Sequence, residues 1–450
     1  MKKKEILEIA EKENLRLIRF LYCDLAGVIR GKTVTASQLS SKMAEGVGLT
    51  RAQHAVNLFE ELVSIEGMEP VGEVRIVPDV DTFSLLPWLN RTASMHSDLE
   101  NQDGTAWDGC TRSVLKRVLA KLEDQGMEFM SAFESEFYLA EKSDVGPVPW
   151  MNGPCYSSSG MDRASNVVDQ MVDNLTEQGI IVEQAINEYG PGQQEIAIKY
   201  GPALKSADQH LQFRDTIRGT AEVQFGLLAS LAPKPFKDGI GSGAHLHFSL
   251  WDKKKDLNLL YNELEPTKLS ALGESFVAGV LEHLPGLLAL TCPSYVSFLR
   301  LKPQSWAGNT ISWGYDNREC AVRVASPFKG REMQSINLEL KACDGSANPY
   351  LALAGLILAG MDGVERGLKA PKAAHRDPSF LSEEEKIACG IKPFPATQLE
   401  ALSALENDLV LTTGLGELMT RAYLATRRAE NAKASLNGDE WARLETFSTF

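Results

Sequence analysis

The stretch 127–139, MEFMSAFESEFYL, constrains the fold more than any other part of the chain, because its large apolar residues and its two central glutamates fall on opposite parities. Glu134 and Glu136 share one parity, so a β-strand would place both carboxylates on one face. The other parity carries bulky apolar residues, namely Met127, Phe129, Phe133, Phe137 and Leu139. Two carboxylates this close oppose each other's ionisation. Either their face is exposed to water, where glutamate is common, or a hard divalent cation offsets the repulsion.

The composition is that of an ordinary globular protein and argues against some classes of partner. The 450 residues are 44% hydrophobic and 24% charged, and this length suits two domains. A net charge of −14 argues against nucleic acid and against an anionic membrane surface. We expect no signal peptide and no membrane-spanning segment. Seven scattered cysteines without a CxxC pair indicate reduced thiols in a cytoplasmic protein.

Residues 1–106 are expected to form a small domain that mixes helix and strand. The predicted elements are a helix over 3–13, a hairpin of strands 16–23 and 28–35, and a strand over 74–78. The polar, turn-rich stretch 96–108 indicates a boundary, after which a second domain covers 107–450.

The second domain alternates long helices with strands that carry charged residues on one parity. Helices are predicted over 112–125, 161–178, 203–232, 269–290 and from 349 onward. Strands are predicted over 127–139, 180–186, 193–200, 244–250, 295–301, 319–325 and 335–341. This order favours an α+β catalytic domain with a site lined by its sheet.

More acidic and imidazole groups lie where such strands would project them. Glu195 alternates with apolar residues, and Glu188 lies just before a Gly-Pro-Gly turn that would fold it back toward Glu195. One parity of GSGAHLHFSL holds His245, His247 and Ser249, and one parity of SINLELK holds Asn337, Glu339 and Lys341. A lone strand histidine is more often packed than ligating. Two histidines at a spacing of two, with several strand carboxylates available, favour a metal site.

Basic residues gather in the same part of the chain. The stretch 300–341 contains Arg300, Arg318, Arg323 and Lys341. Because the chain as a whole is acidic, this clustering of basic residues suggests that they contact an anion. For any single arginine, a salt bridge to one of the same glutamates is the simpler interpretation. Arg318 and Arg323 are five residues apart and would point to opposite faces of a regular strand. At least one of them therefore lies in a turn or has a structural role.

Together these patterns indicate a hard-metal site with an anion-binding wall. Phosphoryl transfer from a metal-bound nucleotide fits this set of residues, because the reaction requires mainly that the reactants are positioned and that the charge of the phosphates is neutralised. The sequence contains no GxxxxGK[ST] motif and no kinase-type glycine-rich loop, so a different architecture would hold the nucleotide.

The pattern resembles the glutamine synthetase family along almost the whole chain. The segments that carry the resemblance, in the family's order, are DLAGVIRGK, FESEF, EYGPGQQE, GSGAHLHFSL, NREC–AVR and ELKACDGSANPYLALAGLILAGMDG. The resemblance implies a small N-terminal β-grasp domain and a large catalytic domain whose curved antiparallel sheet encloses a funnel. It also implies a homo-oligomer, usually a dodecamer of two stacked hexameric rings. In such rings the neighbour's N-terminal domain completes each site.

The resemblance also implies roles for individual residues, with ATP and glutamate as substrates and two to three Mg²⁺ or Mn²⁺ ions per site. One ion would be held by Glu136, Glu188 and Glu195, and the nucleotide-side ion by Glu134, His245 and Glu339. Nucleotide contacts would come from His247, Ser249 and Arg323. Substrate contacts would come from Arg300, which takes the α-carboxylate of glutamate, from Gly241, Glu188 and Lys341, and from Trp306. Arg318 and Arg323 would grip the transferring phosphate, so Arg300, Arg318, Arg323 and Glu339 are the expected catalytic residues.

The departures from the family's pattern bear on the nucleophile. Trp306 stands where ammonia-using members carry a glutamate, and residues 49–52 read Leu-Thr-Arg-Ala where an aspartate loop is usual. Ile240 replaces an asparagine, and Lys341 replaces an arginine. Losing two acidic groups weakens the attraction for a small cation. An indole offers apolar surface and a cation–π face to a larger amine.

The sequence therefore predicts a ligase that forms a γ-glutamyl amide with an organic amine, such as an alkylamine or polyamine, through γ-glutamyl phosphate. One alternative is an ordinary glutamine synthetase that uses ammonia, with Glu60 or Glu61 replacing the lost acids. A second is a ligase for an acid other than glutamate, because Ile240 and Lys341 both lie where the amino acid should bind. A third is a catalytically inactive ring assembly. Six retained metal ligands argue against it, because their mutual repulsion has no purpose there.

Overall fold

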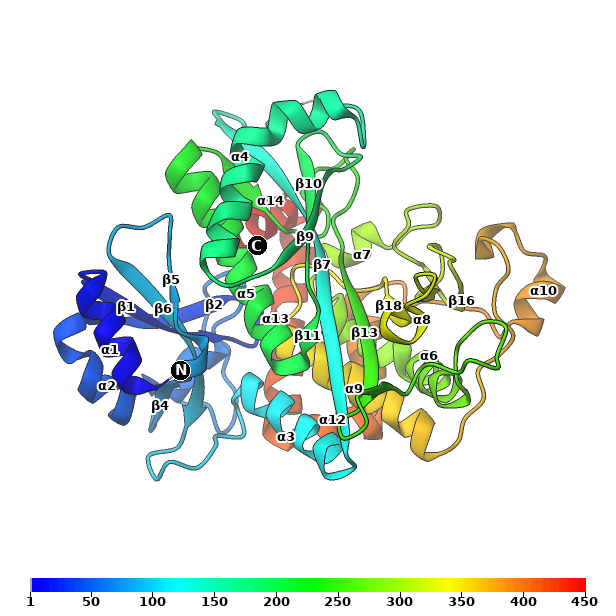
Figure 1. The fold of residues 1–450 in the computed structure, drawn as a ribbon, viewed down its shortest axis with the longest axis horizontal. Coiled ribbons are helices and arrows are strands. Elements are labelled where there is room, and N and C mark those ends of the chain that lie inside the picture. The colour runs from blue at the N-terminus through cyan, green and yellow to red at the C-terminus, as the bar shows by residue number, and fades with distance from the viewer. Residues whose placement is uncertain (1, 152) are drawn as a thin grey trace.

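The computed structural model describes residues 2–151 and 153–450. Its N-terminal part is a sheet of six described strands in the order β2-β1-β6-β4-β3, with β5 beside β6. Their bounds are β1 (Leu17–Cys23), β2 (Ile29–Thr35), β3 (Val47–Thr50), β4 (Glu73–Pro78), β5 (Ser84–Leu85) and β6 (Thr92–Glu100). Helices α1 (Lys3–Lys12) and α2 (Leu39–Glu45) pack on this sheet, at the left of Figure 1. The parallel pairing of β1 with β6 gives the mixed sheet expected of a β-grasp domain.

A larger sheet organises the rest of the chain around one long central strand. In the order of pairing it contains β16 (Trp313–Tyr315), β17 (Val322–Ala325), β18 (Asn337–Leu340), β13 (Ala244–Asp252), β7 (Met127–Ser143), β10 (Gln193–Ile198) and β9 (Val182–Asn187). Short strands extend it, β8 (Gly146–Pro149), β11 (Gly201–Pro202) and β12 (Leu228–Ser230) on β7, and β14 (Leu257–Asn258) on β13. Only β16 and β17 pair in parallel among the described strands of this sheet. Figure 1 shows β7 and β13 side by side through the middle of the molecule.

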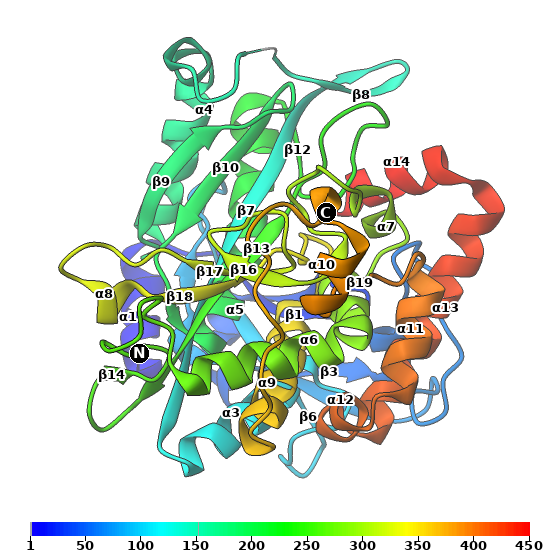
Figure 2. The ribbon, with the colours of Figure 1, turned by 90° about the vertical axis from the view of Figure 1, so that its right-hand side faces the viewer.

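Helices cover the apolar face of this sheet. Phe129 on β7 stacks on Phe248 of β13 with ring centroids 5.6 Å apart, and Phe248 packs on Phe276 at 5.5 Å. The helices of this layer are α3 (Thr111–Asp124), α5 (Ala203–Gly219), α6 (Ala271–Thr291), α9 (Pro349–Glu365), α11 (Gln398–Asn407), α12 (Leu409–Leu415) and α13 (Glu417–Asn437) (Figure 2). Burying one parity of β7 directs the other parity, with both glutamates, to the opposite face.

The remaining elements lie around the ends of the large sheet. Helix α4 (Ser158–Glu177) packs on β9, and the C-terminal helix α14 (Asp439–Thr449) lies against β12. The small elements are α7 (Ser297–Arg300), α8 (Glu332–Ser335), α10 (Glu383–Ala388), and the paired strands β15 (Thr310–Ile311) and β19 (Lys392–Pro393). None of the helices in the described ranges is long and apolar enough to cross a membrane.

The tip of the predicted β1–β2 hairpin holds the two parts of the chain together. Gly27 has φ +79° in the turn, and a side chain there would meet the Ser346 carbonyl oxygen at 2.7 Å. The Asn348 side-chain amide donates to the Asp24 carbonyl at 2.9 Å, and its oxygen accepts from the Tyr350 backbone N–H at the start of α9. The hairpin prediction is confirmed, and the turn is built for this close approach.

Three predictions about elements are wrong. The stretch 295–301 is not a strand but contains the helical turn α7, which follows a turn closed by the Ser294 hydroxyl, the acceptor for the Ser297 backbone N–H. The predicted helix 203–232 ends as α5 at Gly219, continues as a π-helical turn over Thr220–Gln224, and becomes β12 after Gly226 at φ +69°. The stretch 96–108 is not all loop, because β6 extends to Glu100.

A buried histidine joins three helices behind the sheet. His283 on α6 contacts Asp408 at the start of α12 through Nδ1 at 2.7 Å and Asp362 on α9 through Nε2 at 3.0 Å. Arg366 neutralises the same carboxyl of Asp362 and also Glu282, each at 2.7 Å. Burial opposes the charged form of His283, but both aspartates outweigh it and raise its pKa. The ion pairs leave this cluster complete without a metal.

We predict that His283→Gln destabilises the protein more at pH 6 than at pH 9. Because the pKa of His283 is raised in the folded state, its protonation stabilises the folded protein fully at pH values below the ordinary histidine pKa of about 6.5. This stabilisation is lost as the pH rises through the pKa of the folded state. The expected loss at pH 6 is about 1–3 kcal/mol, typical of a hydrogen bond to a charged group. Thermal unfolding measured at both pH values checks it, with the variant of exposed His375 (His375→Gln) as control. An equal loss at both pH values would contradict it.

Candidate active site

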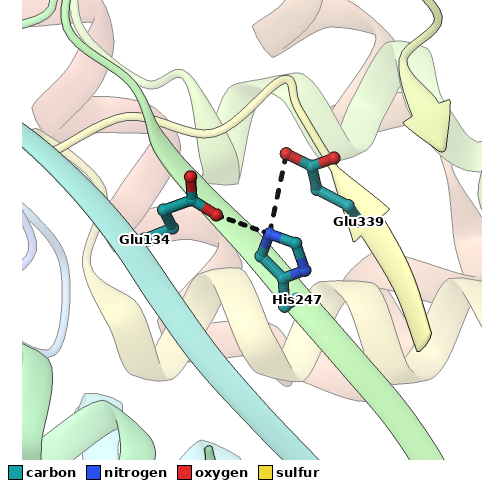
Figure 3. A group of neighbouring side chains, drawn as sticks. All are labelled: Glu134, His247 and Glu339. Atoms are coloured by element: carbon teal, nitrogen blue, oxygen red, sulfur yellow. Dashed lines mark hydrogen bonds and ion pairs between the residues drawn. The ribbon is translucent and has the colours of Figure 1, made fainter. Parts of the chain in front are cut away.

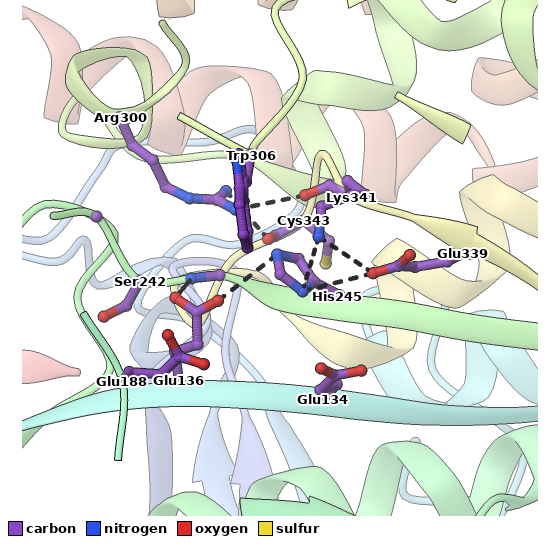
Figure 4. A network of polar contacts seen from close by, with 12 residues as sticks. Glu134, Glu136, Glu188, Ser242, His245, Arg300, Trp306, Glu339, Lys341 and Cys343 are labelled. Carbon is purple, nitrogen blue, oxygen red and sulfur yellow. Dashed lines mark hydrogen bonds and ion pairs between the residues drawn. The ribbon is translucent and has the colours of Figure 1, made fainter. Parts of the chain in front are cut away.

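The strand register gathers the acidic and imidazole side chains on the face opposite the helices. Glu134 pairs with His245 across β7 and β13, and Glu136 pairs with Glu195 across β7 and β10. Glu339 on β18 lies opposite His247 of β13. Because paired residues of neighbouring strands point to the same face, four strands contribute to one site. Figure 4 shows Glu134 and Glu136 of β7, His245 of β13 and Glu339 of β18 converging.

A cavity of about 500 Å³ contains this face of the sheet. All six predicted metal ligands line it: Glu134, Glu136, Glu188, Glu195, His245 and Glu339. The predicted substrate and phosphate residues also line it, namely Gly241, Arg300, Trp306, Arg318, Arg323 and Lys341. Residues far apart in the sequence therefore meet as predicted.

The first predicted ligand group is a set of carboxylates that repel each other. Glu195 is 3% exposed, and its Oε1 has no hydrogen-bond partner among the described residues. Burial and the charges of Glu134 and Glu136 raise the pKa of Glu195 to about 10. Burial raises the pKa of Glu136 to about 7, against the lowering effect of Arg300 and of the Gly243 N–H, which donates at 2.9 Å. A buried carboxylate oxygen without a donor is what a hard cation would satisfy.

The second group differs in detail from the prediction. The closest trio is Glu134, His247 and Glu339, whose ligand atoms lie within 4.8 Å of one another (Figure 3). His247 Nε2 lies 2.8 Å from Glu134 Oε2 and 3.7 Å from Glu339 Oε1. His245 lies between the two groups, with Nδ1 3.5 Å from Glu339 and Nε2 3.8 Å from Glu136. Thus His247, which we expected on the nucleotide side, faces the same carboxylates as His245.

These donors suit Mg²⁺ or Mn²⁺. Carboxylate oxygens with an imidazole are the ligands such ions accept, and the buried Glu195 Oε1 has no hydrogen-bond partner among the described residues. Burial opposes the charged form of His247, yet Glu339 and Glu134 raise its pKa. Burial also opposes ionisation of Glu134, and the His247 contact outweighs it and lowers the pKa to about 2. A charged imidazole therefore partly neutralises the cluster.

Basic side chains line the same cavity as the acidic ones. Arg300 is buried and donates to the carbonyls of Cys343 at 3.2 Å and Lys341 at 3.4 Å. A side chain at position 241 would meet Arg300 Cγ at 2.7 Å, so Gly241 lets the arginine pass. Arg323 is paired with Glu339 on the neighbouring strand. Arg318 lies in the turn before β17, as the spacing of the two arginines required.

Lys341 lies among the predicted metal ligands rather than out toward the substrate space. Its Nζ is 3.3 Å from both His245 Nδ1 and Glu339 Oε1, and the residue is 4% exposed. The sequence predicted that Lys341 contacts the substrate, but not that it contacts His245 and Glu339. The ammonium supplies a buried positive charge between an imidazole and a carboxylate.

An aromatic row borders the open side of the cavity. The Trp306 ring meets Tyr189 edge-on, with centroids 5.8 Å apart at 78°, and Tyr189 meets Tyr156 at 6.2 Å and 70°. The Tyr156 hydroxyl donates to Glu188 Oε1 at 3.2 Å. All three rings are about half exposed. The sequence predicted a role for Trp306 but not for either tyrosine. Only the position of Tyr189 directly after Glu188 pointed to it, and no local pattern pointed to Tyr156.

Several predicted residues lie outside this cavity. Ser249 accepts from the Trp251 indole N–H at 2.8 Å and does not line the cavity. Glu60 pairs with Arg30, and Glu61 pairs with Lys433. Neither acid faces Trp306 within this chain, so within it neither replaces the missing glutamate.

Comparison with known proteins identifies the glutamine synthetase family over almost the whole chain. A family model described as the glutamine synthetase catalytic domain matches residues 108–445, and one described as the glutamine synthetase N-terminal domain matches residues 1–107. A Streptomyces coelicolor protein named gamma-glutamylpolyamine synthetase GlnA3 is 36% identical over 414 residues, 91% of this chain and 88% of the relative. A glutamine synthetase of Halobacterium salinarum is 32% identical over 445 residues, 97% and 94% of the two chains.

Solved structures of glutamine synthetase homologues have the same fold. A structure described as a novel glutamine synthase homolog superposes with a TM-score of 0.85 at 31% identity, covering 95% of this chain and 97% of the other. An ADP complex of GmaS gives a TM-score of 0.85 at 28% identity, covering 98% and 99%. The similarity therefore extends over both parts of the chain.

We predict that Mg²⁺ or Mn²⁺ raises the melting temperature, and that Glu195→Gln removes most of this rise. The raised pKa of Glu195 means that the folded protein keeps a proton that the unfolded chain releases above about pH 4.5. Without metal, stability therefore falls as pH rises, and a bound cation restores it. At a hundred times Kd the gain is about 2.7 kcal/mol.

Thermal unfolding at pH 6.5 and 8, in chelator and in metal, measures both effects. Glu183→Gln, at an exposed position on β9, is the matched control. An equal metal-induced rise in the wild type and in Glu195→Gln would show that Glu195 is not a ligand.

Proposed function

The chain belongs to the glutamine synthetase family of ATP-dependent ligases, and we propose that it joins the γ-carboxyl group of glutamate to an organic amine. The observation that carries this choice is Trp306, which lines the cavity beside Tyr189 at the open side. An aromatic face attracts an ammonium group through its π-electrons and also accommodates an alkyl chain. The relative named as a γ-glutamylpolyamine synthetase supports the same class of substrate.

The cavity residues have a place in this chemistry. Arg300 binds the α-carboxylate of glutamate, and the acidic ligands hold divalent ions that neutralise the phosphates of ATP. The γ-carboxylate of glutamate attacks the γ-phosphorus of ATP, which gives γ-glutamyl phosphate and ADP. Arg318 and Arg323 steady the phosphoryl group. The neutral amine then displaces phosphate and forms the amide.

The amine must lose a proton before it attacks. Glu188 lies beside the aromatic row, where its Oε1 accepts from the Tyr156 hydroxyl at 3.2 Å, so its carboxylate is within reach of an amine held there. We assign it the proton from the incoming ammonium group. Trp306 and Tyr156 hold the carbon skeleton of the amine while this happens.

The site is proposed to be complete only in an assembly. All residues of the described ranges that line the cavity lie between Glu134 and Lys341, so the N-terminal domain of the same chain contributes none. We propose a cytoplasmic dodecamer of two hexameric rings, in which the neighbour's N-terminal domain covers the open side. Residues 1–106 and 107–450 are the proposed domains. ATP contacts are proposed for His247 and Arg323, and for Ser249 only in a nucleotide pose that extends beyond this cavity.

The alternative is an ordinary glutamine synthetase, which the name of the Halobacterium relative supports. We predict that kcat/KM for the amine substrate, measured by ADP release at saturating ATP and glutamate, is highest for an organic amine. The panel contains ammonia, methylamine, ethylamine, isopropylamine, ethanolamine and putrescine at matched free-amine concentrations. A far higher kcat/KM for ammonia would refute the proposal. No turnover at all with bound metal would favour an inactive assembly.

We also predict that Trp306→Glu shifts the preference toward ammonia by about tenfold or more, because it restores a carboxylate where the indole stands. The ratio of kcat/KM for ammonia to that for the best amine measures the shift. Phe328→Glu, at another exposed aromatic residue, is the control and should leave the ratio unchanged. If Trp306→Glu leaves it unchanged too, amine selection resides elsewhere.

A further inference from the structure

The loop that carries Trp306 has an unusual backbone. Gln304, Trp306 and Gly308 have φ angles of +57°, +53° and +68°, so three alternate residues occupy the left-handed region. Residues with a side chain rarely adopt it, and they do so where the surroundings hold them. A specific contact must therefore keep Trp306 in this conformation.

Glu319 supplies that contact. Its Oε1 accepts from the Trp306 backbone N–H at 3.1 Å. Glu319 is itself fixed, because its backbone N–H donates to the Asn317 side-chain oxygen at 3.2 Å. The Asn317 amide in turn donates to the carbonyls of Ala374 and Arg376 at 3.1 and 2.9 Å. A chain of hydrogen bonds thus ties the Trp306 backbone to a distant segment.

Little else orients the indole. Trp306 is 49% exposed, and its described ring contact is the edge-on one with Tyr189, itself 54% exposed. With so little packing, the direction of the ring follows the direction of its backbone. Glu319 does not line the cavity, so it does not meet the substrates directly.

We propose that Glu319 is a positioning residue that sets amine specificity by holding Trp306 over the amine site. This rests on the proposed function, because it assumes that Trp306 contacts the amine. Removing the carboxylate releases the Trp306 N–H and lets the loop leave its left-handed conformation. The indole then leaves the amine site, while the glutamate and ATP sites keep their residues.

The test compares Glu319→Ala with Glu319→Gln, which keeps an acceptor oxygen at the same place. With ATP and glutamate saturating, we expect Glu319→Ala to raise KM for the preferred amine about tenfold, and Glu319→Gln to stay within about twofold of the wild type. KM for ATP and for glutamate should stay within about twofold in both. Glu332→Ala is the matched control, because Glu332 also accepts from a loop N–H, that of Gly330, but at an exposed turn.

A double-mutant cycle decides whether Glu319 acts through Trp306. In a Trp306→Ala background, Glu319→Ala should add no further rise in the amine KM. Additive effects, equal effects of Ala and Gln at position 319, or a matching rise in KM for glutamate would overturn the inference. If Trp306→Ala impairs amine use and Glu319→Ala does not, only this inference fails. If Trp306→Ala changes the use of no amine, the proposed function fails first.

Discussion

The repulsion between carboxylates that the strand register forces together is the constraint on which the rest of this structure depends. Glu134, Glu136, Glu195 and Glu339 are directed to one face because the opposite parity of β7 and its neighbours is buried against helices. The sheet cannot relieve the repulsion by rotating a strand without exposing its apolar face. Neutralisation must come from elsewhere, and in the protein alone it comes from Lys341, His247, Arg323 and retained protons.

This arrangement explains why the site is poised for an ATP-dependent reaction. We propose that the buried carboxylates that hold protons without metal would become ligands when a divalent ion binds, so that the groups that repel each other would hold the ion. We propose that the arginines of the same cavity bind the anionic substrates. The aromatic row lies beside Glu188, where by the same proposal a cationic amine would meet π-faces and a carboxylate together.

The sequence predicted the features that depend on period and on local chemistry. The alternation of FESEF placed both glutamates on one face, the DLAG turn predicted the hairpin, and the strands that carry five of the six predicted ligands were found. It failed where tertiary contacts decide. The turn at Ser294 precedes α7 in a strand-like pattern, and Gly226 redirected the chain from helix to β12. Tyr156, Glu319 and the inward position of Lys341 follow from long-range packing, which leaves no local signal.

Diffraction from crystals grown with Mn²⁺, recorded at the manganese absorption edge, tests the central claim most directly. The account predicts anomalous peaks inside the cavity, one among Glu136, Glu188 and Glu195 and one among Glu134, Glu339 and the imidazoles, each at coordinating distance from carboxylate oxygens. Peaks only elsewhere, for instance beside His283, or no peak at all with the carboxylates still gathered, would contradict it.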